Sequence, residues 1–106
     1  MVEMERIRDL TQRIAREFKP YKIILFGSYA YGYPRSDSDV DILVVLPFKG
    51  KAVRKAIEIR NTVNAGMPLD LLVRTPEQVT ERVSQNDWFM REIVERGHVL
   101  YESNNT

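Results

Sequence analysis

One stretch, residues 23–45, constrains the fold of this chain more than any other. It contains an apolar run, a Gly-Ser pair, a polar loop and a second apolar run that starts beside two aspartates. Short apolar runs rich in β-branched residues and bounded by turn residues are typical of buried strands. We therefore predict two strands, at 21–26 and 40–46, with a polar loop between them.

Two carboxylates lie at the start of the second predicted strand, Asp39 and Asp41. Because strand side chains alternate between the two faces, these residues project to the same side, with Cα atoms about 6.5–7 Å apart. Neighbouring carboxylates repel each other unless one is protonated, a basic group lies nearby or a cation binds between them. Mg²⁺ suits the pair best, since it takes oxygen ligands and is bound by carboxylates together with substrate phosphates. The pair therefore favours phosphate chemistry.

The Gly-Ser pair, Gly27 and Ser28, directly follows the first predicted strand. A glycine lets the backbone approach a ligand, and a helix N-terminus offers free N–H groups to an anion. Ser28 is open to two interpretations. It is either the N-cap of a short helical turn at 29–31, or a residue whose hydroxyl binds a triphosphate. The downstream aspartates favour the second interpretation.

With Asp39 and Asp41 twelve and fourteen positions after Gly27, this stretch resembles the Gly-Ser, Asp-x-Asp signature of the DNA polymerase β-like nucleotidyltransferase superfamily. Within that superfamily, Phe-Gly-Ser-Tyr-Ala-x-Gly, Ser-Asp-x-Asp and the late Gly-His-Val-Leu-Tyr-Glu resemble the minimal nucleotidyltransferases, small proteins often paired with a helical HEPN-domain partner in toxin–antitoxin pairs. The resemblance covers about residues 18–102. Many relatives carry arginine where Tyr31 stands, so this chain lacks a cationic contact there.

The resemblance implies transfer of a nucleoside monophosphate, AMP from ATP, to a hydroxyl group, with release of pyrophosphate. It implies that Asp39 and Asp41 bind two Mg²⁺ ions, and that Asp70 shares the catalytic ion and accepts the proton of the attacking hydroxyl. Gly27 and Ser28 would hold the β- and γ-phosphates. These five residues form the candidate site.

Asp70 is the one acidic residue within a third apolar run, 69–74. Burying an unpaired carboxylate is costly, so a charge in such a run needs a reason. One interpretation pairs Asp70 with Arg74, four residues on and on the same face of a strand. The other makes Asp70 the third carboxylate of the site, and the upstream motif favours it.

Helical patterns surround the predicted strands. Apolar residues recur at spacings of three and four over 3–18, which predicts an amphipathic helix. A broader apolar face predicts a second helix over 52–65, stopped by Gly66 and Pro68. A helix between two strands permits a parallel pairing with a right-handed crossover.

The C-terminal third predicts two short helices and a last strand. Residues 75–78 form a capping box that starts one helix, and Asn86 or Asp87 caps the next. We expect Trp88 in the core and a short strand at 98–101. The fold class is therefore α+β: a small mixed sheet of three main strands and a short fourth, with helices packed against it. The resemblance likens this arrangement to the palm of polymerase β-type enzymes.

Length and composition set limits on function. The 106 residues allow one domain, 1–102, followed by a tail at 103–106 that we expect to be disordered. Sixteen basic and fifteen acidic residues give a net charge of +1, which disfavours a dedicated nucleic-acid binder. No cysteine is present for disulfides or a zinc–thiolate site. No apolar stretch approaches ~20 residues and no signal peptide is visible, so we expect a cytoplasmic protein with no membrane partner.

A chain of this length has little room for the extra domain with which larger nucleotidyltransferases grip a primer or a drug. We therefore expect a second protein to present the acceptor, in a hetero-oligomer. For this family the resemblance implies a HEPN-domain partner whose tyrosine hydroxyl is modified. The competing hypothesis is a non-catalytic, antitoxin-like module that neutralises a HEPN partner by occlusion. A third is a subunit of an RNA- or drug-modifying transferase. The three carboxylates and the Gly-Ser pair favour the enzyme.

Overall fold

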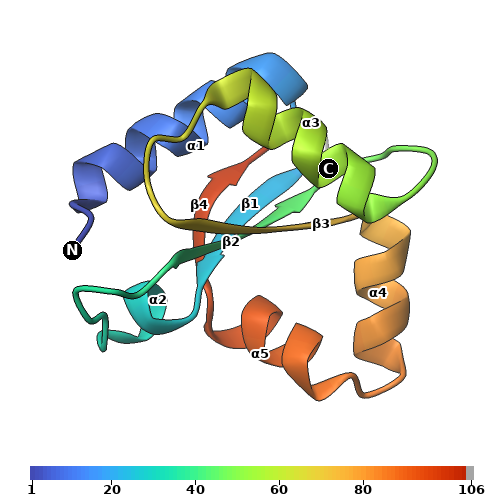
Figure 1. Ribbon diagram of the computed structural model, residues 1–106. Coiled ribbons are helices and arrows are strands. Elements are labelled where there is room, and N and C mark those ends of the chain that lie inside the picture. The colour runs from blue at the N-terminus through green and yellow to red at the C-terminus, as the bar shows by residue number, and fades with distance from the viewer. Residues whose placement is uncertain (105–106) are drawn as a thin grey trace.

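A four-stranded mixed sheet forms the centre of the structure (Figure 1), a computed structural model that describes residues 1–104. The order of its strands is β3-β2-β1-β4. The strand bounds are Lys22–Phe26 (β1), Val40–Val45 (β2), Leu69–Arg74 (β3) and His98–Glu102 (β4). β1 runs antiparallel to both β2 and β4, whereas β2 and β3 are parallel. The predicted α+β class and the mixed sheet are confirmed.

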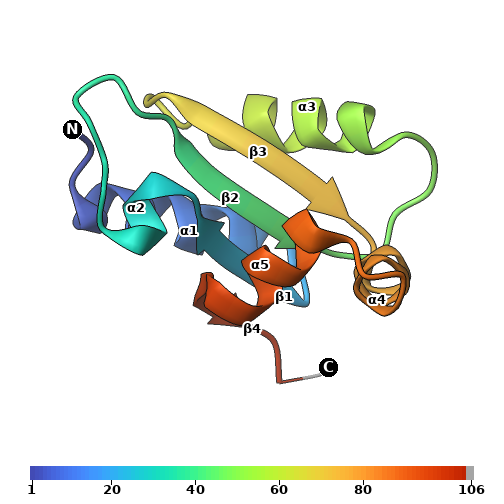
Figure 2. The same cartoon turned by 90° about the horizontal axis from the view of Figure 1, so that it is seen from below.

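Helices cover both faces of this sheet (Figure 1). Their bounds are Met4–Phe18 (α1), Ser28–Tyr31 (α2), Ala52–Val63 (α3), Pro76–Ser84 (α4) and Trp88–Arg96 (α5). α1 and α3 pack on one face, and α4 and α5 lie on the other. Seen from below in Figure 2, α5 lies against the sheet while α4 is viewed end-on beside the end of β3. α3 connects β2 to β3, as the predicted crossover requires.

Alternation along the strands sorts the core into two clusters, one on each face. The α1 and α3 side buries alternate strand residues such as Ile23, Ile42 and Leu71. The α5 side buries their neighbours, including Ile24 and Leu43, against Met90 and Ile93. β1 and β2 are therefore covered on both faces, which explains why their sequences read as nearly continuous apolar runs.

Two predicted helix ends are governed by left-handed residues. α1 ends at Phe18, the predicted last residue, and its C-cap Lys19 has φ 48° and directly precedes Pro20. The stop predicted for the second helix at Gly66 and Pro68 is wrong, because α3 already ends at Asn64 with φ 48°. Asparagine adopts the left-handed region more easily than other residues with a side chain, so it ends the helix first.

The C-terminal helices are capped by side chains, as predicted. Thr75 and Gln78 form the reciprocal capping box of α4. Of the two candidates for α5, Asp87 is the cap, and its carboxylate accepts from the Met90 amide at 3.0 Å. This cap makes Trp88 the first residue of the helix and turns it outward, with 76% of its surface exposed. The expected core position of Trp88 is wrong.

The chain leaves the sheet after β4, which runs one residue further than predicted. The Ser103 amide donates to the carbonyl of Tyr21, the residue before β1, at 2.9 Å, so the first residue of the predicted tail is tied to the sheet. Of the tail predicted to be disordered, residues 105–106 lie outside the described residues. None of the helices formed by residues 1–104 is both long and apolar enough to cross a membrane.

We expect Gly97→Ala to destabilise the fold, because Gly97 joins α5 to β4 in very close contact with β1. A Cβ atom built on it would lie 2.5 Å from Ile24 Cγ2 and 3.0 Å from the Leu25 carbonyl oxygen. Forcing an extra methyl into a packed core costs about 1–3 kcal/mol or more. Urea unfolding measures this loss. Glu95→Ala, an exposed change on the same helix, serves as the control, and equal midpoints for both variants would contradict the packing argument.

Candidate active site

Two of the predicted carboxylates meet where β2 and β3 begin. Asp41 and Asp70 are each the second residue of their strand and are direct partners in the parallel register. Neighbouring strands lie about 4.8 Å apart, so the two side chains emerge next to each other. Leu43 and Leu72, two residues further along each strand, belong to the cluster on the α5 side. The carboxylates therefore face α5.

The environment of Asp41 favours its neutral form. Burial of this half-buried carboxyl, the negative charges of Asp70 and Asp39 and a hydrogen bond with Asp70 together raise its pKa to about 6. Burial is the largest of these causes, and the hydrogen bond acts because it stabilises the proton that the pair shares. Within residues 1–104, the two adjacent carboxyl groups thus have no positively charged group that neutralises them.

Arg74 does not supply that counter-charge. Its Nη1 donates to the Val73 carbonyl at 2.7 Å, and within residues 1–104 no ion pair joins Arg74 to Asp70. Burial and the nearby Arg82 lower the pKa of Arg74. The structural interpretation of Asp70 as the partner of Arg74 is therefore wrong.

Asp39 occupies a different position from the other two carboxylates. It is exposed, one residue before β2, and acts on Asp41 through its charge. In the described part of the chain no three Asp, Glu, His or Cys side chains converge closely enough to hold a metal ion. The structure thus brings Asp41 and Asp70 together and leaves Asp39 beside them.

Gly27 gives the Asp41 carboxylate its space. Gly27 follows β1 with φ 73°, and a Cβ atom on it would overlap the Asp41 carboxylate. The antiparallel pairing of Phe26 with Asp41 explains this approach, because it brings the end of β1 to the start of β2. A side chain at position 27 would displace the carboxylate.

Ser28 is the first residue of α2, and Gly27 occupies the N-cap position. The N-cap interpretation of Ser28 is therefore wrong. Its carbonyl accepts from the Gly32 and Tyr33 amides, whereas its hydroxyl forms no hydrogen bond to any residue in 1–104. The first N–H groups of a helix have no acceptor within it. The Ser28 hydroxyl and amide are thus available to a ligand beside the carboxylates.

A pocket of about 260 Å³ contains the carboxylate pair, and one of its walls is α5. Its lining residues are Phe26, Gly27, Tyr31, Asp41, Asp70, Phe89, Glu92 and Ile93. Phe89 packs edge-on against Phe26, with ring centroids 5.7 Å apart, so the wall is fixed to β1. Sequence analysis did not predict any residue of this wall. The only signal was the three- and four-residue spacing of Phe89, Glu92, Ile93 and Arg96.

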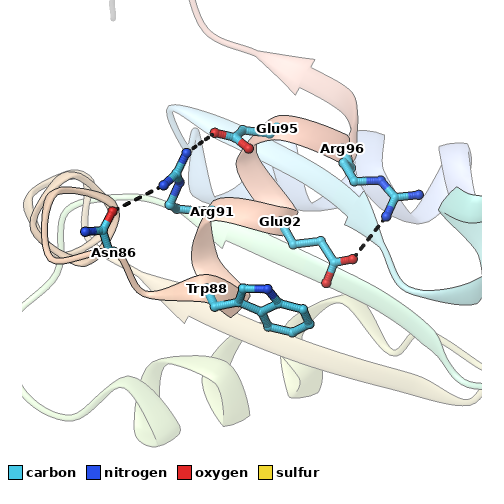
Figure 3. A pocket seen from close by; sticks show the side chains of 6 residues that line it. All are labelled: Asn86, Trp88, Arg91, Glu92, Glu95 and Arg96. Atoms are coloured by element: carbon cyan, nitrogen blue, oxygen red, sulfur yellow. Dashed lines mark hydrogen bonds and ion pairs between the residues drawn. The ribbon is translucent and has the colours of Figure 1, made fainter.

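A larger pocket of about 440 Å³ lies along α5 (Figure 3). It is lined by Asn86, Trp88, Arg91, Glu92, Glu95 and Arg96. Figure 3 shows Arg91 between Asn86 and Glu95, while Glu92 pairs with Arg96 one turn away. Glu92 also lines the carboxylate pocket, so the two hollows adjoin. Only the smaller one holds the paired aspartates, and we assign the candidate site to it.

Comparison with known proteins gives consistent matches. The sequence profile of the nucleotidyltransferase domain matches residues 7–101. A candidate protein adenylyltransferase of Methanocaldococcus jannaschii is 29% identical over 103 residues, covering 95% of this chain and 100% of the relative.

Two solved structures share the fold. One, a toxin–antitoxin crystal structure with AMP-PNP, has a TM-score of 0.61 and 20% identity, covering 92% of this chain and 75% of that one. The other, a candidate nucleotidyltransferase from Sulfolobus solfataricus, has a TM-score of 0.56 and 19% identity, covering 93% and 79%.

We expect Asp41→Asn to stabilise the metal-free protein at neutral pH and to lose this advantage in acid. Folding raises the pKa of Asp41 from 3.8 to about 6, so the folded chain binds the proton more tightly than the unfolded chain. The resulting stability is fully present below pH 3.8 and is lost as the pH rises through about 6. Asparagine never ionises and avoids this loss.

Urea unfolding in EDTA at several values between pH 4 and pH 8 measures the difference between wild type and Asp41→Asn. Asp37→Asn, a change of an exposed carboxylate in the loop before the site, is the matched control. A stability difference that stays constant across this range would contradict the proposed repulsion.

Proposed function

Because this chain belongs to the nucleotidyltransferase domain family, we propose that it transfers AMP from ATP to a hydroxyl group on a partner protein and releases pyrophosphate. The observation that carries the proposal is the pairing of Asp41 with Asp70 beside Gly27, in a pocket at the start of their strands. Paired oxygen ligands next to free N–H and hydroxyl donors suit a metal-bound triphosphate.

The relatives support the choice of nucleotide and acceptor. The Methanocaldococcus jannaschii protein is named for adenylyl transfer to protein, and the toxin–antitoxin structure contains AMP-PNP, an analogue of ATP. We infer from the resemblance that the partner of this chain is a HEPN-domain toxin and that the acceptor is a tyrosine hydroxyl. This chain would then act as the antitoxin of a hetero-oligomer.

The residues present fit a magnesium site. Asp41 and Asp70 offer adjacent carboxylate oxygens, and burial together with the neighbouring carboxylates raises the pKa of Asp41, an effect that a bound cation would oppose. We assign these two residues, with Asp39 beside them, as ligands of two Mg²⁺ ions. When bound, such ions stabilise the charge on the attacking and leaving oxygens of phosphoryl transfer.

The chain itself supplies position and proton transfer. Gly27 leaves room for the carboxylate and for close approach of the phosphates, while the Ser28 hydroxyl and amide donate to the β- and γ-phosphate oxygens. Asp70 is exposed, so it can reach an acceptor that arrives from solvent, and we assign it as the group that accepts the proton of the attacking hydroxyl.

One observation favours a second candidate function. Because three carboxylates do not converge within residues 1–104, the chain also fits a non-catalytic module that neutralises its partner by occlusion. The two candidate functions differ in one requirement. AMP transfer needs the Asp41–Asp70 pair, whereas occlusion needs only a surface that binds the partner. Variants of the pair therefore separate them.

We expect Mg²⁺ and ATP to stabilise the protein together more than either does alone. Mg²⁺ keeps several waters and needs substrate phosphates to complete its coordination shell. A ligand at ~100 times its Kd stabilises the folded state by ~2.7 kcal/mol. Thermal unfolding with Mg²⁺, with ATP in EDTA, and with both measures this cooperation. Equal shifts under the three conditions would rule out a metal-bridged nucleotide site.

We expect Asp41→Asn and Asp70→Asn each to abolish AMP transfer and leave partner binding intact. An amide is a poor ligand for Mg²⁺ and a poor proton acceptor, but it keeps the volume of the carboxyl group. The measurement is transfer of labelled AMP from ATP to a co-purified partner, beside a pull-down, with Asp37→Asn as the control.

Transfer at the wild-type rate by both site variants would refute the carboxylate assignment. A wild type that binds its partner and transfers nothing would favour occlusion.

A further inference from the structure

All of the charged side chains that line the carboxylate pocket are acidic. Its ionisable carboxylates are those of Asp41, Asp70 and Glu92, and no lysine or arginine is among its lining residues. A nucleoside triphosphate is itself strongly anionic. Besides a metal ion at the paired aspartates, the phosphate end of such a ligand therefore needs a cation from the protein.

The Arg96 guanidinium lies at the edge of this pocket. Its Cζ atom is 4.8 Å from the centre of the Tyr31 ring. Tyr31 lines the pocket together with Gly27, and it is the last residue of α2, the helix that Ser28 begins. Arg96 therefore contacts a residue that lines the pocket together with the Gly-Ser turn.

Charged groups from α5 and from β2 act on Tyr31. Burial and the Glu92 carboxylate raise the pKa of its hydroxyl, Arg96 opposes them, and Asp41 adds a smaller raising effect. The Arg96 cation and the Asp41 carboxylate thus both act on one tyrosine. The cation is close to the site although it lies on a different element.

Arg96 is held loosely enough to move. Its partner is Glu92, one turn earlier on α5, with Nη1 and Oε1 3.3 Å apart (Figure 3). The Arg96 side chain is 64% exposed, and exposed ion pairs of this kind contribute little to stability. A guanidinium stacked on a ring keeps its N–H edges available for planar, bidentate contact with phosphate oxygens.

We propose that Arg96 is the phosphate-binding cation of this site, contacting the terminal phosphates of the nucleoside triphosphate. The Tyr31 ring and the Glu92 carboxylate hold the guanidinium beside the pocket until the ligand arrives. This inference rests on the proposed nucleotidyl transfer, because it names how that substrate is bound.

Arg91 provides a matched control on the same helix. It pairs with Glu95 at 3.1 Å, with the same four-residue separation as the Arg96 pair. Its second contact is the side chain of Asn86, which lies between α4 and α5, whereas Arg96 is at the other end of α5 (Figure 3). A general effect of removing positive charge from α5 would appear in both arginine variants, whereas a phosphate contact affects Arg96 alone.

The test is calorimetric titration of wild type, Arg96→Ala, Arg96→Lys and Arg91→Ala with ATP, and separately with AMP, in Mg²⁺. Charge-assisted hydrogen bonds at exposed positions predict about tenfold weaker ATP binding for Arg96→Ala. We expect a smaller loss for Arg96→Lys, which keeps the charge without the planar fork. AMP binding by Arg96→Ala and ATP binding by Arg91→Ala should match the wild type. The exposure of Arg96 predicts that thermal unfolding without ligand is unchanged.

Equal ATP affinity in wild type and Arg96→Ala would overturn the assignment of Arg96 while leaving the proposed function in place. Equal losses in Arg96→Ala and Arg91→Ala would overturn it too, by showing a general charge effect. If the wild type bound no nucleotide at all, the proposed function would fall together with the assignment.

Discussion

The parallel register between β2 and β3 is the constraint on which the site depends. It sets Asp41 opposite Asp70, and the helical connection α3 makes a parallel pairing possible. A slip by one residue would turn every side chain of one strand to the other face. The apolar neighbours of the two aspartates prevent that slip, because alternate residues are buried on both faces of the sheet. Packing of the core thus holds two charges together that repel each other.

The pattern of apolar residues predicted this framework well, since buried strands leave a strong local signal. The predicted strands match the observed ones to within one residue, and the resemblance to nucleotidyltransferases is confirmed by the family match over residues 7–101. The predictions failed where a helix cap determined which residues of the helix face the core. The Asp87 cap fixed the register of α5, so the inward positions fell on Met90 and Ile93 and left Trp88 in solvent.

The wall formed by α5 could not be predicted from local patterns, because about fifty residues separate Asp41 from Glu92 and only the fold brings them together. The resemblance also led us to expect no cationic contact at Tyr31. The structure places a guanidinium over that ring from the far end of the chain. Tyr31 departs from the residue usual in the family, and Arg96, which belongs to no known motif, supplies the cationic contact at this position.

The electrostatics of the pair link stability to the chemistry proposed for it. Without a cation, ionisation of Asp41 opposes folding, since burial and two neighbouring carboxylates raise its pKa to about 6. A bound divalent cation would remove that opposition by favouring the ionised form, so cation and proton compete for the same oxygens. The proton competes most strongly at and below about pH 6, whereas above it Asp41 is ionised and the protein gains most from the cation. The repulsion that the core imposes on the two carboxylates would thus add to the binding free energy of the metal-bound nucleotide.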